Sequence, residues 1–174
     1  MVHPLTLGTI GYLTRAFIRN MAIEIERKFL VHSALFTPPE DGKYIKQGYL
    51  SVEPSRTVRV RISGSDAWLT VKGKSVGASR LEFEYPIPLE EAQILLDSLC
   101  EQIIEKIRYR IPQGSLCWEV DVFLGQNAPL LLAEIELPSE HTQVDLPAWV
   151  AQEVTEDPRY FNSRLGQNPY QSWS

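Results

Sequence analysis

Eight segments of this chain alternate between charged and apolar residues with a period of two, and no other feature limits the fold as strongly. Successive side chains of a β-strand point to opposite faces, so this period predicts strands with one charged and one apolar face. The predicted strands cover residues 22–31, 44–52, 57–63, 66–73, 80–87, 102–111, 115–124 and 129–138. Three of the connections, at residues 64–66, 112–114 and 125–127, contain the glycine and polar residues of tight turns, which indicates an antiparallel meander.

Helical patterns are short and few. Residues 89–99 follow Pro88 with acids in the first turn and an apolar face, which predicts an amphipathic helix. We also expect a short helix at residues 147–154, with a proline in its first turn, and a final turn or two at residues 158–167. The predicted fold class is therefore α+β, mainly β, because so few helices cannot cover both faces of a large sheet.

The strong patterning begins only near Met21. Residues 1–20 contain two arginines and no acid, so they could be a transit-like segment or an over-long start. We expect residues 1–20 to be an N-terminal extension outside the fold, with Met21 as the working initiator. No repeat or linker interrupts the rest, so we expect residues 21–174 to form a single domain.

The polar face of nearly every predicted strand consists of acids or bases alone. These faces are Glu24, Glu26 and Lys28; Arg59 and Arg61; Lys72; Arg80, Glu82 and Glu84; Lys106, Arg108 and Arg110; Glu119 and Asp121; and Glu134 and Glu136. A solvated surface would explain any one of these strands, but charged rows along seven strands suit an enclosed site better. Eight antiparallel strands can close into a barrel that holds one small ligand. We therefore expect a closed eight-stranded antiparallel barrel with a charged lumen.

A lumen of this kind predicts a particular chemistry. Basic rows favour a polyanion, and acidic rows beside them would repel that anion unless they held cations. Three scattered histidines and two cysteines without CxxC spacing leave carboxylates as the metal ligands, which favours Mg²⁺ or Mn²⁺. Metal-bridged phosphate among Arg and Lys is the setting for phosphoryl transfer, so the residues indicate a metal-dependent enzyme acting on a phosphate chain.

Composition excludes two classes of partner. The formal net charge of −5, from 17 Lys and Arg against 22 Asp and Glu, argues against a protein whose main task is to bind nucleic acid. No apolar run approaches the roughly 20 residues of a membrane span. We expect a cytoplasmic protein with reduced cysteines. Its apolar outer strand faces and scarce helices are compatible with a homodimer.

The segment from Ile23 to Leu30 contains an ExExK motif and resembles the CYTH superfamily, also called triphosphate tunnel metalloenzymes. The resemblance covers about residues 22–165, in the family's order. It continues through Gln47-Gly48-Tyr49-Leu50, Arg59-x-Arg61, Thr70-Val71-Lys72, Arg80-x-Glu82-x-Glu84, Glu105-Lys106-x-Arg108-Tyr109, Glu119-x-Asp121, Glu134-x-Glu136 and Glu153-Val154-Thr155-Glu156-Asp157. The family's fold is a closed eight-stranded antiparallel barrel, the triphosphate tunnel, with a C-terminal helix that plugs one end.

The resemblance implies roles for individual residues. The expected metal ligands are Glu24, Glu26, Asp121, Glu134 and Glu136. The expected phosphate-binding residues are Lys28, Arg59, Arg61, Lys72, Lys106 and Arg108. Further residues expected to line the tunnel, without an assigned role, are Glu82, Glu84, Glu119 and one or both of Arg159 and Arg164.

This chain most resembles the short bacterial branch of the family, in its length and in its QGYL segment. The resemblance implies a tyrosine that is paired with the motif lysine. In this sequence the pair is Tyr49 and Lys28. A tyrosine, with a pKa near 10, can act as a general base near neutral pH only if a nearby cation lowers that pKa. The alternative is that Tyr49 is an aromatic residue of the wall.

Hydrolysis of inorganic triphosphate to pyrophosphate and phosphate is the leading functional prediction. Relatives with this tunnel also act as class IV adenylate cyclases, thiamine triphosphatases or RNA triphosphatases, so the fold does not fix the substrate. A non-catalytic polyphosphate-binding module is a further alternative, which would need the basic rows but could lose Tyr49 or the acids. An unrelated ligand would predict an apolar lumen with the charges outside.

Overall fold

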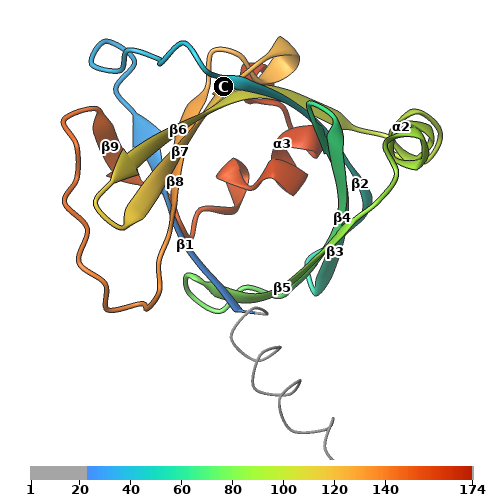
Figure 1. Ribbon diagram of the computed structural model, residues 1–174, viewed down its shortest axis with the longest axis horizontal. Coiled ribbons are helices and arrows are strands. Elements are labelled where there is room, and N and C mark those ends of the chain that lie inside the picture. Colours follow the sequence, from blue (N-terminus) through green and yellow to red (C-terminus); the bar gives the residue numbers. More distant parts are fainter. Residues whose placement is uncertain (1–22, 174) are drawn as a thin grey trace, which may run out of the picture.

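A computed structural model describes residues 23–173, and these residues form a closed ring of strands. The expected extension at residues 1–20 lies outside them. The ring strands are β1 (Ile23–Val31), β2 (Lys43–Glu53), β3 (Arg56–Ser63), β4 (Asp66–Gly73), β5 (Ser79–Pro86), β6 (Ile103–Gln113), β7 (Leu116–Phe123) and β8 (Leu131–Glu136). They correspond to the eight predicted segments. Figure 1 looks along the ring.

All neighbouring strands of the ring are antiparallel. Their order is β5-β4-β3-β2-β6-β7-β8-β1, and a pairing of β1 with β5 closes the circle. This closing pairing is the shortest, with three residue pairs: Ile23 with Leu81, Glu24 with Arg80 and Ile25 with Ser79. The predicted eight-stranded antiparallel ring is thus confirmed.

Glycines set two of the tight connections. Gly64 lies between β3 and β4 with a φ of 62°, and Gly114 lies between β6 and β7 with a φ of 60°. Side chains with a Cβ rarely adopt such positive φ values, so glycine allows a two-residue hairpin connection at each place.

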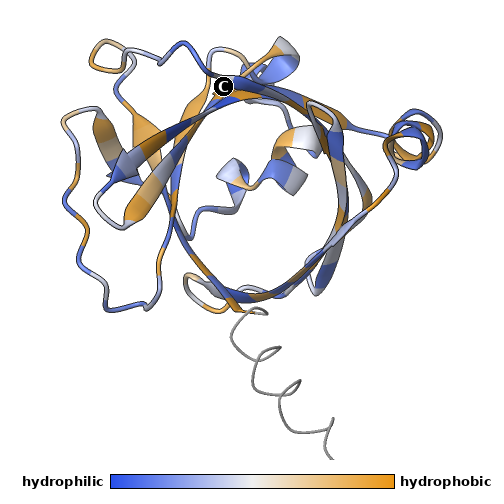
Figure 2. Ribbon diagram, viewed as in Figure 1, coloured by the Kyte–Doolittle hydropathy of each residue, from blue (hydrophilic) through white to orange (hydrophobic). Residues whose placement is uncertain are grey.

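The apolar faces of the strands pack mainly outside the ring, and hydrophobic and hydrophilic residues alternate along the strands (Figure 2). One outer cluster joins Phe29, Trp118 and Ile135 to the segments that follow β1 and β8. A second lies beneath α2 (Leu89–Ser98), the predicted amphipathic helix, whose Ala92 and Leu96 are buried. The outer face of β5 stays open, because Leu81, Phe83 and Tyr85 are 38–53% exposed.

A third cluster closes one end of the ring from inside. The C-terminal segment forms η2 (Pro158–Tyr160), α3 (Asn162–Gln167) and η3 (Tyr170–Ser172). Leu165 of α3 is fully buried against Ile104, Leu132 and their neighbours. Figure 1 shows α3 within the outline of the ring. The expected final turns are therefore present and form the predicted plug.

The expected short helix at residues 147–154 is wrong, because half of this segment forms the strand β9 (Val150–Glu153) and no helix lies in it. β5 pairs with β1 only as far as Ile25, which leaves the rest of that edge free. β9 occupies the free edge opposite Phe29 and Val31, and the Val154 backbone N–H donates to the Lys28 carbonyl. Backbone groups of β1 that would otherwise be unpaired thus outweigh a weak helical pattern. No helix within residues 23–173 is long and apolar enough to cross a membrane.

Candidate active site in the ring

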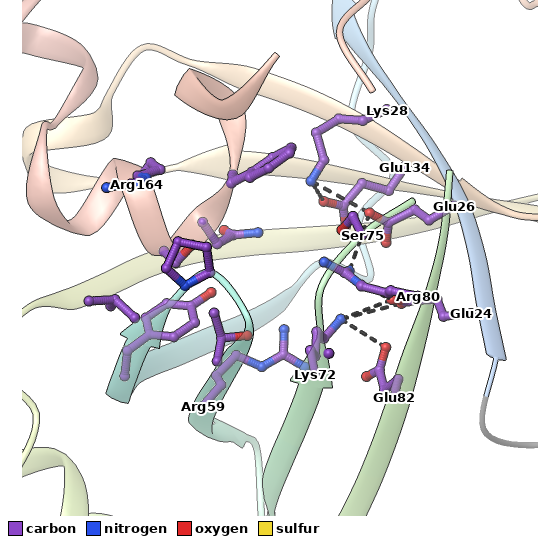
Figure 3. A pocket seen from close by; sticks show the side chains of 18 of the residues that line it. Glu24, Glu26, Lys28, Arg59, Lys72, Ser75, Arg80, Glu82, Glu134 and Arg164 are labelled. Carbon is purple, nitrogen blue, oxygen red and sulfur yellow. Dashed lines mark hydrogen bonds and ion pairs between the residues drawn. The ribbon is translucent and has the colours of Figure 1, made fainter. Parts of the chain in front are cut away.

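A cavity of about 440 Å³ occupies the ring and is lined by eight basic and seven acidic side chains. The basic residues are Lys28, Arg59, Arg61, Lys72, Lys74, Arg80, Arg108 and Arg164. The acidic residues are Glu24, Glu26, Glu82, Glu84, Glu119, Glu134 and Glu136. The predicted charged faces therefore point inward, and Figure 3 shows several of these side chains converging from different strands.

Strand register places opposite charges next to one another. Glu24 on β1 pairs in register with Arg80 on β5, and Lys28 on β1 pairs with Glu134 on β8. Lys28 Nζ lies 2.5 Å from Glu134 Oε1 and 3.6 Å from Glu26 Oε1. Opposite charges therefore meet at these two places, whereas the register also sets Glu26 opposite Glu136, so that two acids face each other there.

The same arrangement continues around β4 and β5. Lys72 Nζ lies 3.2 Å from Glu24 Oε2 and 2.8 Å from Glu82 Oε2. Arg61 Nη2 lies 3.1 Å from both carboxylate oxygens of Glu84. Most charges of the lumen are therefore paired with one another, and an incoming anion or cation has to exchange with these ion pairs.

Two of the predicted residues, Lys106 and Asp121, lie in the wall and do not line the cavity. Lys106 Nζ is 2.5 Å from Asp121 Oδ2, and Arg108 donates from Nε and Nη2 to both Asp121 oxygens at 2.6 Å. Burial lowers the pKa of Lys106 to about 8 despite the attraction of Asp121. Burial raises the pKa of Asp121, but the two cations lower it by more. Asp121 thus positions Lys106 and Arg108 here.

Tyr49 lines the cavity from β2, as predicted, but no hydrogen bond joins it to Lys28 among the described residues. Burial raises its pKa above the ordinary value of 10, although Arg59, Arg80 and Lys28 oppose that rise. Lys28 is instead paired with Glu134 and Glu26, which raise its pKa more than burial lowers it. The raised pKa values of Tyr49 and Lys28 favour the protonated form of both side chains.

Carboxylates gather around Glu136. Burial, together with Glu24, Glu119 and Glu26, raises the pKa of Glu136 to about 7. Within residues 23–173, no three acidic, histidine or cysteine side chains are already arranged as a metal site. However, burial and the neighbouring carboxylates both disfavour a negative charge on Glu136, and a hard divalent cation among these oxygen donors would compensate it, so the residues fit such an ion.

Two arginine side chains of the cavity have donors without a partner within residues 23–173, which indicates a place for an anion. Buried Nε atoms of Arg59 and Arg61 have no hydrogen-bond partner among the described residues. Buried polar groups are normally paired, and an anion would supply the acceptors that these two guanidinium groups lack.

The two C-terminal arginines separate. Arg164 on α3 lines the cavity (Figure 3). Arg159 does not, because its side chain is 65% exposed and its Nη2 lies 2.6 Å from Asp157 Oδ2. Of the two candidates, the structure therefore places only Arg164 at the cavity.

Several lining residues were not among the predicted site residues. Arg80 carries a sequence signal, since it shares the inward face of β5 with Glu82 and Glu84. Lys74 and Ser75 follow β4, and Phe161 and Asn162 belong to the C-terminal plug. These four lie outside the ring strands, where no alternating pattern could reveal them.

Known proteins resemble this chain over most of its length. The model of the CYTH domain matches residues 22–164. An inorganic triphosphatase of Acetivibrio thermocellus is 47% identical over 154 residues, which cover 88% of this chain and 99% of that protein. An inorganic triphosphatase of Nitrosomonas europaea is 39% identical over 148 residues, which cover 82% of this chain and 95% of that protein.

Solved structures agree with these matches. The crystal structure of the inorganic triphosphatase NE1496 superposes with a TM-score of 0.59 at 34% identity, covering 82% of this chain and 93% of that one. A putative adenylate cyclase of Bacillus halodurans also has a TM-score of 0.59, at 19% identity, covering 68% of this chain and 82% of that one. The second likeness concerns the fold alone.

Proposed function

Because this chain belongs to the CYTH domain family, we propose that it hydrolyses inorganic triphosphate to pyrophosphate and phosphate inside its ring. Relatives named inorganic triphosphatase match nearly their whole length at 47% and 39% identity. The observation that carries the proposal is the enclosed cavity, in which eight basic side chains face a space of about 440 Å³. Such a cavity suits a small, highly charged anion.

Binding of the phosphate groups would depend on the inward bases. Those we assign to this role are Lys28, Arg59, Arg61, Lys72, Lys106 and Arg108. The free Nε donors of Arg59 and Arg61 support the assignment. Lys106 would act from the wall, since its ammonium group is buried beside Asp121. Positioned cations stabilise the charge that develops during phosphoryl transfer, so these residues would orient the substrate and lower the barrier.

We assign Glu24, Glu26, Glu134 and Glu136 to holding Mg²⁺ or Mn²⁺, with Asp121 as the fifth carboxylate of the set. Burial and the neighbouring carboxylates raise the pKa of Glu136, which supports a cation at this place. A bound divalent ion would supply Lewis-acid stabilisation of phosphate charge. Asp121 accepts hydrogen bonds from Lys106 and Arg108, so it would bind the metal ion only if that ion replaced these hydrogen bonds.

Tyr49 with Lys28 is our candidate for proton transfer. Tyr49 lies at the cavity, and Lys28 is one of three cations that lower its pKa. Because burial outweighs these cations, the tyrosine would act as a base most effectively in alkaline solution. The alternative role, an aromatic residue of the wall, predicts no such dependence.

The deciding experiment is a substrate panel. Phosphate release would be measured from triphosphate, ATP and thiamine triphosphate with Mg²⁺, with Mn²⁺ and with EDTA. We expect turnover of triphosphate above that of the organic triphosphates, and its loss in EDTA. Absence of triphosphate turnover under every metal condition would refute the proposal, while preferred turnover of ATP would point to nucleotide chemistry.

We place the protein in the cytoplasm. Cys100 and Cys117 are both free thiols in the structure, as expected of proteins in a reducing compartment. Fractionation of the producing cells, followed by detection of the protein, would test this location.

A further inference from the structure

Arg80 occupies a special position at the closure of the ring. It lies on β5 directly opposite Glu24 on β1, within the three residue pairs that join these strands. Its side chain is 25% exposed and lines the cavity. The residue therefore belongs both to the seam of the ring and to the charged lumen.

The contacts of Arg80 link two carboxylates of the ExExK motif. Arg80 Nε donates to Glu24 Oε2 at 2.5 Å, and Nη2 lies 3.8 Å from Glu26 Oε1. Figure 3 shows the guanidinium group between these two glutamates. Among the described residues, no other base forms ion pairs with both Glu24 and Glu26, since Lys72 pairs with Glu24 but not Glu26, and Lys28 pairs with Glu26 but not Glu24.

Two carboxylates within reach of one guanidinium group need a counter-cation when no metal ion is bound, because like charges repel. The Arg80 guanidinium supplies this charge from within the chain. A divalent ion that binds to Glu24 and Glu26 has to displace it. Since the tethered cation competes for the same oxygens, its presence lowers the affinity for the free ion.

We propose that Arg80 is a built-in counter-cation that keeps Glu24 and Glu26 in place in the metal-free ring and thereby sets the affinity for the divalent metal. Arg80 is in this view a positioning residue. The inference rests on the proposed function in one respect, namely that Glu24 and Glu26 are metal ligands. It adds a residue whose removal should strengthen metal binding, whereas removal of a ligand should weaken it.

Direct metal binding tests the proposal without turnover. Mn²⁺ would be titrated in the absence of triphosphate, with electron paramagnetic resonance to detect the free ion. Arg80→Gln should bind Mn²⁺ about tenfold more tightly than the wild type, because one competing positive charge is gone. Arg80→Lys keeps the charge and should stay near the wild type. Glu24→Gln should weaken binding in both the wild-type and the Arg80→Gln backgrounds.

Arg27→Gln is the matched control. Arg27 lies on the same strand as Glu24, but its Nη2 pairs with Glu153 Oε2 at 2.5 Å, outside the cavity. The Arg27→Gln substitution removes the same charge as Arg80→Gln and should leave the affinity for Mn²⁺ unchanged. Unchanged or weaker binding by Arg80→Gln would overturn the proposal, and so would an equal gain in Arg27→Gln.

Thermal unfolding keeps the test decisive if Arg80→Gln is unstable. A ligand that binds only the folded state raises the unfolding midpoint, so Mn²⁺ should raise it more in Arg80→Gln than in the wild type. A variant that folds only with Mn²⁺ would support the proposal, because the ion then replaces the missing charge. A variant that stays unfolded with Mn²⁺ would overturn it.

Failure of this inference can be told apart from failure of the proposed function. If wild-type protein hydrolyses triphosphate but Arg80→Gln gains no Mn²⁺ affinity, only the role of Arg80 is refuted. If Arg80→Gln gains affinity but no variant releases phosphate, only the proposed activity is refuted.

Discussion

Most acids of the lumen form ion pairs with bases on other strands, and this shapes what a single substitution does. Glu24 accepts from Lys72 and Arg80, and Glu134 from Lys28 and Arg108. Removing one partner of a buried ion pair leaves the other charge without compensation, which is costly. A substitution here therefore alters the state of its neighbours as well as the site it removes.

Replacement of Glu24 by alanine should reduce turnover of triphosphate at limiting Mg²⁺ or Mn²⁺ by about a hundredfold, because a proposed metal ligand is lost. Excess metal should restore part of the rate. Steady-state phosphate release over a range of metal concentrations measures both effects. Glu101→Ala is the control, since Glu101 is exposed outside the cavity. Wild-type turnover by Glu24→Ala at limiting metal would exclude a ligand role.

Tyr49 leads to a prediction about pH. If its deprotonated form is the general base, the active fraction increases up to tenfold per pH unit below the pKa, and burial places that pKa above about 10. The rate should therefore keep rising from about pH 8 toward pH 10 in the wild type. Tyr49→Phe should lose this rise.

The control for Tyr49 is another tyrosine with a raised pKa. Burial and a hydrogen bond to Glu105 raise the pKa of Tyr44 to about 12, and Tyr44 lies outside the cavity. Tyr44→Phe should keep the wild-type pH–rate profile. A Tyr49→Phe variant with that same profile and rate would leave Tyr49 as an aromatic residue of the wall.

At the scale of elements, the plug α3 combines two tasks. Leu165 is fully buried in the cluster that closes the ring, while Arg164, its neighbour in sequence, lines the cavity. Because the helix has only six residues, its position depends on packing against β2, β6 and their neighbours more than on helix propensity. Damage to the packing should therefore displace the arginine as well.

Leu165→Ala should lower the free energy of unfolding by about 2–5 kcal/mol, the usual cost of a large-to-small change in a core. Urea denaturation followed by tryptophan fluorescence would measure this. Leu146→Ala is the matched control, since Leu146 is 52% exposed and should change stability by about 0.5 kcal/mol or less. An equal loss in both variants would show that the plug contributes no specific packing.

The elements also show how far sequence reasoning extends. Alternation within one strand is a local property, so the eight ring strands and the inward position of Glu82 or Arg61 follow from the sequence. β9 could not be predicted this way, because its four residues form a strand only where β5 leaves the edge of β1 free. Lys74 could not be predicted either, because it lies in the connection after β4, where no alternating pattern marks a residue that lines the cavity.

For the molecule as a whole, the paired lumen couples the binding of cations to that of anions. Triphosphate alone would bind bases such as Lys28 and leave their acidic partner, Glu134, unpaired. A metal ion alone would bind the acids and leave the bases unpaired. Only the two together satisfy both sets. Coupling between binding sites is reciprocal and commonly amounts to 5–150-fold in affinity, or about 1–3 kcal/mol.

A nitrogen-bridged triphosphate analogue that resists hydrolysis should therefore bind at least about tenfold more tightly with Mn²⁺ than in EDTA, as measured by isothermal titration calorimetry. Formation of the Mn²⁺–analogue complex in buffer would be titrated separately and subtracted. Glu134→Gln should bind the analogue more tightly than the wild type in EDTA, because Lys28 and Arg108 are no longer held by that carboxylate. Mn²⁺ should increase the affinity of Glu134→Gln for the analogue by a smaller factor than in the wild type, because Lys28 and Arg108 are already free of that carboxylate. Equal affinity with and without Mn²⁺ in the wild type would show that the ion pairs of the lumen do not oppose the entry of an anion.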